Sequence, residues 1–206
     1  MNVEILQYID YVGTFAFAIT GAFIAAEIGM DLFGIIFLAI LTAVGGGTVR
    51  DIVLDIPVFW LKNPLYIVIA ICASPIVFII KKPFSSISKY LFMFDTCALA
   101  FFAVIGIEKA LFQEVHYFVA FIMGIISAVL GGIIRSLFSR EVSVLYSREL
   151  YATVAAFASF VYLIFKYLNF DLYLSTSLTV ILTFLFRITS IKLDLSLPRA
   201  KEETSE

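Results

Sequence analysis

Seven long stretches of this sequence contain almost no charged residues, and this feature limits the possible folds more than any other. A helix needs roughly 17 to 25 residues to cross a hydrocarbon core about 30 Å thick. Stretches of about that size lie at residues 5–26, 32–49, 64–80, 90–107, 117–134, 150–165 and 172–186. The intervals between them are short and hold charges and turn-forming residues. The pattern predicts an all-α integral membrane protein with seven transmembrane helices and no soluble domain.

The composition agrees with a membrane location and excludes several other classes. Hydrophobic residues make up 62 % of the chain and charged residues 15 %, against about 45–50 % and about 25 % in soluble domains. The formal net charge of −2 is too small to indicate a nucleic-acid partner. Cys72, Cys97 and the single His116 have no metal-ligand spacing. The sequence contains no catalytic or phosphate-binding motif, so we expect neither an enzyme nor a bound cofactor or metal.

The distribution of lysine and arginine indicates the orientation in the membrane. If seven helices alternate across the bilayer, one side holds only Arg50, Lys62, Lys109 and Lys166 of the 14 basic residues. Because short cytoplasmic loops carry the excess of basic residues, we expect a multi-pass protein of the cell membrane with its N-terminus outside. The polar tail at 192–206 is then cytoplasmic and disordered. No basic residue precedes Arg50, so the first helix lacks the positive region of a cleavable signal peptide and is expected to be retained.

An internal repeat relates the two halves of the chain. Adding 85 to a residue number in the first half repeatedly reaches the same or a similar residue. The pairs include Asp10 with Asp95, Gly21 with Gly106, Gly46 with Gly131 and Arg50 with Arg135. Charged residues and glycines are rare in this apolar chain, so their recurrence in register indicates a duplication.

Each copy contains three predicted helices, an odd number, so the second copy must enter the membrane from the opposite side. We therefore predict an inverted repeat, with a first unit at 1–84, a second unit at 85–169 and a seventh helix at 170–191 outside the repeat. In proteins built this way the solute or ion site lies near the midplane of the membrane, between the two copies.

Consecutive glycines mark the second predicted helix and recur in the fifth. The positions of interest are Gly45, Gly46, Gly47 and Thr48 in the second helix, and Gly131, Gly132 and Ser136 in the fifth. Each glycine destabilises a helix interior by about 1 kcal/mol relative to alanine, so we expect a kink or break at both places. Freed carbonyl groups and the two hydroxyls would then line a polar passage for a cation. The alternative is close packing of helices on small residues, which is common in membranes.

Arginines and carboxylates accompany the two glycine motifs. Arg50 and Arg135 each follow the last glycine by three residues, about one helical turn. As functional groups they would line or gate the passage while paired with carboxylates, for which Asp51, Asp10 and Asp95 are the candidates. One alternative is that the arginines snorkel to the membrane interface. Another is that Asp10 and Asp95 cap helices that begin later than predicted.

The seven spans, the duplicated unit and the segments 45–51 (GGGTVRD) and 57–60 (PVFW) resemble the prokaryotic members of the trimeric intracellular cation channel family. The resemblance extends from Ile5 to about Lys192. It implies a homotrimer among membrane lipids, with a pore for monovalent cations, chiefly potassium, in each subunit around the kinked second and fifth helices. By the same resemblance the first kink holds Gly45, Gly46, Gly47, Arg50 and Asp51. In the second motif Leu130 replaces the first glycine, so only Gly131, Gly132 and Arg135 carry over.

Two other functions stay open at this point. The same proteins have been grouped under a domain named for glycine transport, so the alternative is a secondary transporter of a small zwitterion whose carboxylate sits at Arg50 or at a helix N-terminus. The third is a scaffold or lipid-interacting protein in which the repeat is only architectural. Under the channel hypothesis the passage is charged asymmetrically, because Ser136 stands where Asp51 stands in the first copy.

Overall fold

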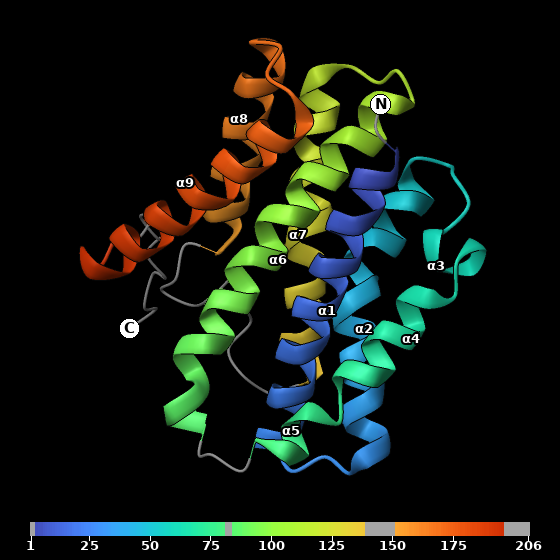
Figure 1. The fold of residues 1–206 in the computed structure, drawn as a ribbon, viewed down its shortest axis with the longest axis vertical. Coiled ribbons are helices and arrows are strands. Elements are labelled where there is room, and N and C mark those ends of the chain that lie inside the picture. Colours follow the sequence, from blue (N-terminus) through green and yellow to red (C-terminus); the bar gives the residue numbers. More distant parts are fainter. Residues whose placement is uncertain (1–2, 81–83, 139–150, 196–206) are drawn as a thin grey trace, which may run out of the picture.

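A computed structural model describes residues 3–80, 84–138 and 151–195 of the chain. Within these ranges every regular element is an α-helix, which confirms the predicted all-α class, and Figure 1 shows the nine helices in chain order. They are α1 Val3–Glu27, α2 Leu32–Val53, α3 Phe59–Lys62, α4 Leu65–Ala73, α5 Ile76–Ile79, α6 Phe84–Phe112, α7 Tyr117–Phe138, α8 Tyr151–Tyr167 and α9 Leu172–Lys192.

Five of these helices, α1, α2, α6, α7 and α9, are long and apolar enough to cross a membrane. Two shorter apolar segments, Leu65–Ile79 and Tyr151–Tyr167, stand where the third and sixth spans are predicted. The first of them is interrupted, since α4 ends at Ala73 and α5 begins at Ile76. Pro75, between them, has no N–H group with which to continue the hydrogen-bond ladder. The expectation of one continuous helix at 64–80 is therefore wrong at this proline.

Two helices begin earlier than the apolar stretches suggest. α1 begins at Val3, and α6 begins at Phe84 rather than at residue 90. Asp10 and Asp95 consequently lie inside their helices, and neither caps a helix N-terminus. That alternative for the two carboxylates is excluded, and both must find partners inside the bundle.

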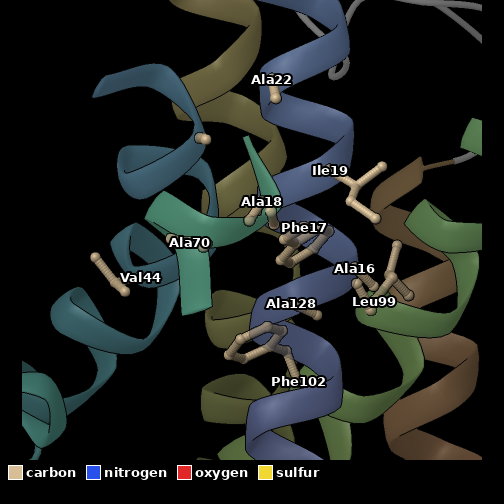
Figure 2. Packing of buried hydrophobic residues seen from close by; sticks show 14 of the residues in the cluster. Ala16, Phe17, Ala18, Ile19, Ala22, Val44, Ala70, Leu99, Phe102 and Ala128 are labelled. Atoms are coloured by element: carbon tan, nitrogen blue, oxygen red, sulfur yellow. The ribbon is translucent and has the colours of Figure 1, made fainter. Parts of the chain in front are cut away.

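Four helices form the centre of the molecule. α1, α2, α6 and α7 lie side by side (Figure 1), α4 and α5 pack against α1, and α8 and α9 pack against α6. The rings of Phe17 in α1 and Phe102 in α6 stack with their centroids 5.2 Å apart (Figure 2). Around them Ala18, Ala70 and Ala128 are fully buried. Small side chains at these positions allow the helix backbones to approach closely.

α2 and α7 cross where the two glycine motifs lie. A Cβ atom on Gly46 would collide with the carbonyl oxygen of Ser127, and one on Gly131 would lie 2.6 Å from the carbonyl oxygen of Thr42. Gly46 thus faces Ser127 while Gly131 faces Thr42, so the helices run antiparallel with backbone against backbone. Ser127 is 85 positions after Thr42, and Gly131 is 85 positions after Gly46, so the two contacts are reciprocal.

A second pair of contacts repeats the same offset. A Cβ atom on Gly21 would lie 2.9 Å from the carbonyl oxygen of Leu38, where α1 packs on α2. One on Gly106 would lie 2.7 Å from the carbonyl oxygen of Met123, where α6 packs on α7. Glycine therefore sets the helix spacing in both halves of the chain.

The glycine motifs do not break their helices. α2 is helical from Leu32 to Val53 and α7 from Tyr117 to Phe138. The expected break at Gly45–Gly47 and at Gly131–Gly132 is therefore wrong, whereas a kink within these continuous helices stays a prediction. The low helix propensity of glycine is offset here by the close packing that the missing side chain permits, which is the alternative weighed from the sequence.

The crossing predicts a large difference between two neighbouring glycines. In Gly46→Ala the new methyl group meets a backbone carbonyl that cannot move aside, so we expect a loss of about 1–3 kcal/mol in the free energy of unfolding. Gly45→Ala is the matched control, because its methyl group meets only the Cδ1 end of the flexible Ile134 side chain. Thermal unfolding of the purified variants in detergent measures both effects. Equal stabilities would contradict a crossing of α2 and α7 at Gly46.

Candidate functional site

The C-terminal end of α2 belongs to a buried cluster of four charged side chains, Asp10, Arg50, Asp51 and Lys109, named the first cluster. Arg50 and Asp51 are completely buried. Arg50 Nε donates to Asp51 Oδ1 at 2.7 Å, and Arg50 Nη2 lies 2.6 Å from the same oxygen. Arg50 Nη1 also donates to Ser127 Oγ of α7 at 3.2 Å. Arg50 therefore does not snorkel outward but is enclosed by a carboxylate and a neighbouring helix.

Lys109 joins the two carboxylates of this cluster. Its Nζ lies 3.7 Å from Asp51 Oδ1 and 3.9 Å from Asp10 Oδ2. Tyr66 OH of α4 donates to the same Asp10 oxygen at 3.2 Å. Three helices, α1, α2 and α6, therefore carry the first cluster, and α4 adds a hydrogen bond to it. The two formal negative charges of the cluster equal its two positive charges.

The chain after α2 folds back over the first cluster through α3. The backbone N–H of Phe59 donates to Asp51 Oδ2 at 2.9 Å. The Phe59 ring lies beneath two cations, with its centroid 4.8 Å from Lys109 Nζ and 5.6 Å from Arg50 Cζ. Aromatic faces attract cations at such distances. α3 thus covers the cluster and orients Asp51 from the side opposite to Arg50 Nε.

The two hydroxyls expected to line the passage bond to their own helices. Thr48 Oγ1 donates to the carbonyl of Val44 at 2.7 Å and accepts from Trp60 Nε1 at 2.9 Å. Ser136 Oγ donates to the carbonyl of Ile133 at 2.8 Å. Trp60 thereby fastens α3 to α2.

A second cluster, Asp95, Arg135 and Arg187, occupies the corresponding place in the other half of the chain. Arg135 Nη2 lies 2.9 Å from Asp95 Oδ1, and Arg187 Nη1 lies 2.7 Å from Asp95 Oδ2. Both oxygens of one buried carboxylate are therefore paired with arginines. Tyr151 OH approaches Asp95 Oδ1 at 3.5 Å, and Tyr151 is 85 positions after Tyr66, the partner of Asp10.

Hydroxyl groups complete the second cluster. Thr20 Oγ1 accepts from Arg135 Nη1 at 2.6 Å, and Thr96 Oγ1 accepts from Arg187 Nη1 at 2.9 Å. A cavity of about 200 Å³ adjoins the cluster and is lined in part by Asp95 and both arginines. The second cluster thus combines one carboxylate with two arginines, whereas the first cluster combines two carboxylates with two cations.

A further ion pair, between the buried Glu108 and the half-exposed Lys166, has no counterpart in the repeat, because Phe23 stands 85 positions before Glu108. Glu108 Oε1 accepts from Tyr162 OH at 2.7 Å and from Lys166 Nζ at 2.6 Å. Glu108 and Lys109 are consecutive in α6, so the same turn of this helix is bound to α8 on one side and to the first cluster on the other.

Sequence reasoning missed Lys109, Glu108 and Arg187 as members of buried clusters. It placed each just beyond the end of a predicted span, since charges were taken to mark helix ends. The useful signal for Arg187 was its spacing, because Thr179 and Thr183 precede it at intervals of four and share its buried face. Among the described residues, no group of three or more His, Cys, Asp or Glu side chains is placed to hold a metal ion.

The sequence matches one protein family in both halves. The family described as "Glycine transporter" matches residues 7–82 and again residues 92–167. The inner membrane protein YadS of Escherichia coli strain K12 is 36 % identical over 198 residues, covering 94 % of this chain and 95 % of that protein. A membrane protein of Vibrio cholerae is 35 % identical over 201 residues, covering 96 % of this chain and 84 % of that protein.

Solved structures of channels have the same fold. The TRIC trimeric intracellular cation channel orthologue from Rhodobacter sphaeroides superimposes with a TM-score of 0.84 at 32 % identity, covering 93 % of this chain and 99 % of that chain. A structure described as explaining conductance through TRIC cation channels has a TM-score of 0.83 at 34 % identity, and the match covers 100 % of both chains.

The second cluster predicts unequal effects of removing its members. Asp95→Asn removes the carboxylate shared by the buried Arg187 and the partly buried Arg135. We expect this to lower the free energy of unfolding by about 3–5 kcal/mol. Arg187→Met is the control, because the Asp95–Arg135 pair survives and its formal charges balance, so we expect a smaller loss. Thermal unfolding in detergent compares the two. An Asp95→Asn protein as stable as Arg187→Met would mean that the carboxylate does not hold this cluster together.

Proposed function

Because the chain belongs to the prokaryotic trimeric intracellular cation channel family, we propose that it conducts monovalent cations, chiefly potassium, through a pore in each subunit of a homotrimer. The similar solved structures are cation channels and not enzymes. We propose potassium as the ion, the position of the pore and the assembly into a trimer together with the channel function.

The observation that carries the pore position is the antiparallel crossing of α2 and α7. Gly46 and Gly131 allow the two backbones to touch, and Arg50 and Arg135 each follow four residues later. Since the helices run in opposite directions, the two arginines lie beyond opposite sides of the crossing. The path we propose therefore leads from one charged cluster past the glycines to the other.

We also propose that the fold is an inverted repeat of seven spans, with units at 1–84 and 85–169, a seventh span at 170–191 and a tail at 192–206. The first residues of the two family matches, 7 and 92, are 85 positions apart. The stacked Phe17 and Phe102 have the same separation, as expected of residues close to a two-fold axis. The excess of basic residues supports an N-terminus outside and a cytoplasmic C-terminus.

The two clusters are the proposed gates. Arg50 and Arg135 would repel a permeating cation, so each must be neutralised or displaced for conduction. Arg50 is paired with Asp51, and Arg135 with Asp95. A rearrangement of these pairs would change the field along the path without unfolding the glycine crossing.

Transport of glycine is the alternative that the family description suggests. In that case Arg50 would bind the carboxylate of the substrate. Two Arg50 nitrogens already bind one oxygen of Asp51, so a substrate would have to displace a buried carboxylate from its partner. This geometry favours the channel over the transporter.

Planar-bilayer recording of the purified protein in a potassium gradient tests the proposal. We expect unitary currents that reverse near the potassium equilibrium potential. Asp51→Asn exposes the charge of Arg50 to the ion, and we expect the unitary conductance to fall on the order of tenfold. Arg50→Ala should change the conductance or the open probability, whereas the control Glu27→Gln, at an exposed position at the end of α1, should leave both unchanged.

The other outcomes of this experiment separate the competing functions. A silent bilayer from folded protein, together with saturable glycine uptake in liposomes, would replace the channel by the transporter. If the folded protein shows no current and no glycine uptake, the remaining hypothesis is the scaffold or lipid-interacting protein. Currents that are unaffected by both cluster variants would support a channel whose path does not pass the first cluster.

A further inference from the structure

The buried face of α1 carries two oxygen atoms to which no described residue donates a hydrogen bond. They are Asp10 Oδ1 and Thr14 Oγ1. Asp10 is 2 % exposed and Thr14 is fully buried. Residues four apart lie on the same face of a helix, about 5–6 Å from Cβ to Cβ. Two oxygen atoms without a hydrogen-bond donor therefore share one side of α1, and one of them belongs to the first cluster.

The hydroxyl of Thr14 behaves differently from most threonines in these helices. Thr42, Thr48, Thr96, Thr179 and Thr183 each donate to the backbone carbonyl four residues earlier. Thr14 makes no such bond to the carbonyl of Asp10 within the described part of the chain. A buried polar atom without a partner destabilises a protein by about 1–3 kcal/mol, so its persistence at this position points to a ligand.

Among the described residues, Lys109 is the cation that forms an ion pair with Asp10, and it is held loosely. Lys109 Nζ lies 3.9 Å from Asp10 and 3.7 Å from Asp51, and its side chain is 27 % exposed. The pairs Arg50–Asp51 and Lys166–Glu108 are both 2.6 Å long. Charge-assisted hydrogen bonds are normally about 2.7–2.9 Å long. Lys109 therefore balances the charge of the two carboxylates without satisfying Asp10 Oδ1.

From this geometry we propose that Asp10 and Thr14, with Asp51 as the second carboxylate, bind one partly dehydrated monovalent cation, and that the Lys109 ammonium competes for this site. Oxygen ligands suit alkali-metal ions. Exchange of Lys109 for an ion of charge +1 leaves the cluster neutral, whereas a divalent ion would leave it positive. The inference rests on the proposed function, because it places an ion-binding step on the proposed path.

The second half of the chain does not repeat this site. Both oxygens of Asp95 are paired with arginines, and Leu99 stands 85 positions after Thr14. The hydroxyl ligand is absent there and the carboxylate is saturated. One ion site is therefore expected in each chain, on the side of the crossing formed by the first cluster.

Thallium(I), an ion close to potassium in size, serves as the probe. A ligand that binds only the folded protein raises its unfolding temperature as its concentration increases. We expect thallium nitrate to stabilise the full chain in detergent relative to N-methylglucamine nitrate, with saturation. Thr14→Val should raise the half-saturating concentration about tenfold, and Lys109→Met should lower it, because the competitor is gone. Asp10→Asn should abolish the effect.

Thr179→Val is the matched control, because Thr179 is as buried as Thr14 but its hydroxyl bonds to Ser175 within α9. We expect thallium to stabilise this variant as it does the wild type. If Asp10→Asn does not fold, Thr14→Val and Lys109→Met still decide, since they are expected to shift affinity in opposite directions. Wild-type affinity in Thr14→Val, or weaker binding in Lys109→Met, would overturn the site.

The thallium experiment can contradict the ion site without contradicting the channel, and the bilayer experiment can contradict the channel without contradicting the ion site. Potassium currents in the bilayer together with thallium stabilisation that is insensitive to Thr14→Val would remove the site and keep the channel. Saturable thallium binding lost in Thr14→Val, together with a silent bilayer, would keep the site and remove the channel.

Discussion

The contact between the backbones of α2 and α7 determines where every charged group of the site can lie. Gly46 meets the carbonyl of Ser127 and Gly131 meets the carbonyl of Thr42, so a methyl group at either position would collide with the backbone of the other helix. Because the helices are antiparallel, the arginine one turn beyond each glycine is carried to the opposite side of the contact. A wider crossing would separate Arg50 from Ser127, to which it donates across the helix pair.

The energy of burying charge then decides the partners of each arginine. An arginine in an apolar bundle must keep a carboxylate beside it, and removing one partner of such a pair is far more destabilising than removing both. In the first half the partner of Arg50 is the next residue in the chain, Asp51. In the second half Ser136 takes that place, and Arg135 depends on Asp95 from α6 instead. One substitution thus redirects an ion pair from within a helix to between helices.

Much of the fold follows from periodicity and hydropathy, but the positions of the helix breaks and the packing partners of the glycines do not. Apolar stretches predict the helices, and the offset of 85 predicts which residues correspond. The break at Pro75 was not predicted because the span at 64–80 was defined by its lack of charge, whereas a break at the glycines was predicted because helix propensity was weighed without the packing partner. The packing partner of Gly46 lies 81 positions away, at Ser127, and no local pattern reveals it.

The candidate site shows the same division. Arg50, Arg135 and the three aspartates could be selected from the sequence because charge inside an apolar stretch is unusual. Lys109 could not, because it lies at the border of a stretch, where charges usually meet water. Arg187 lies at such a border too, and only its spacing from Thr179 and Thr183 marks it in the sequence. Only the three-dimensional arrangement shows that α6 and α9 extend past those borders and turn both side chains inward.

α9 is the element that breaks the symmetry of the clusters. It has no counterpart in the repeat, yet its Arg187 donates to Asp95 Oδ2. In the first half, Asp10 Oδ1 has no hydrogen-bond donor among the described residues. A duplicated three-helix unit would by itself place equivalent carboxylates on both sides of the crossing. The added helix saturates one of them and leaves the other able to accept a cation, so the two ends of the proposed path differ in their carboxylates although their backbones correspond.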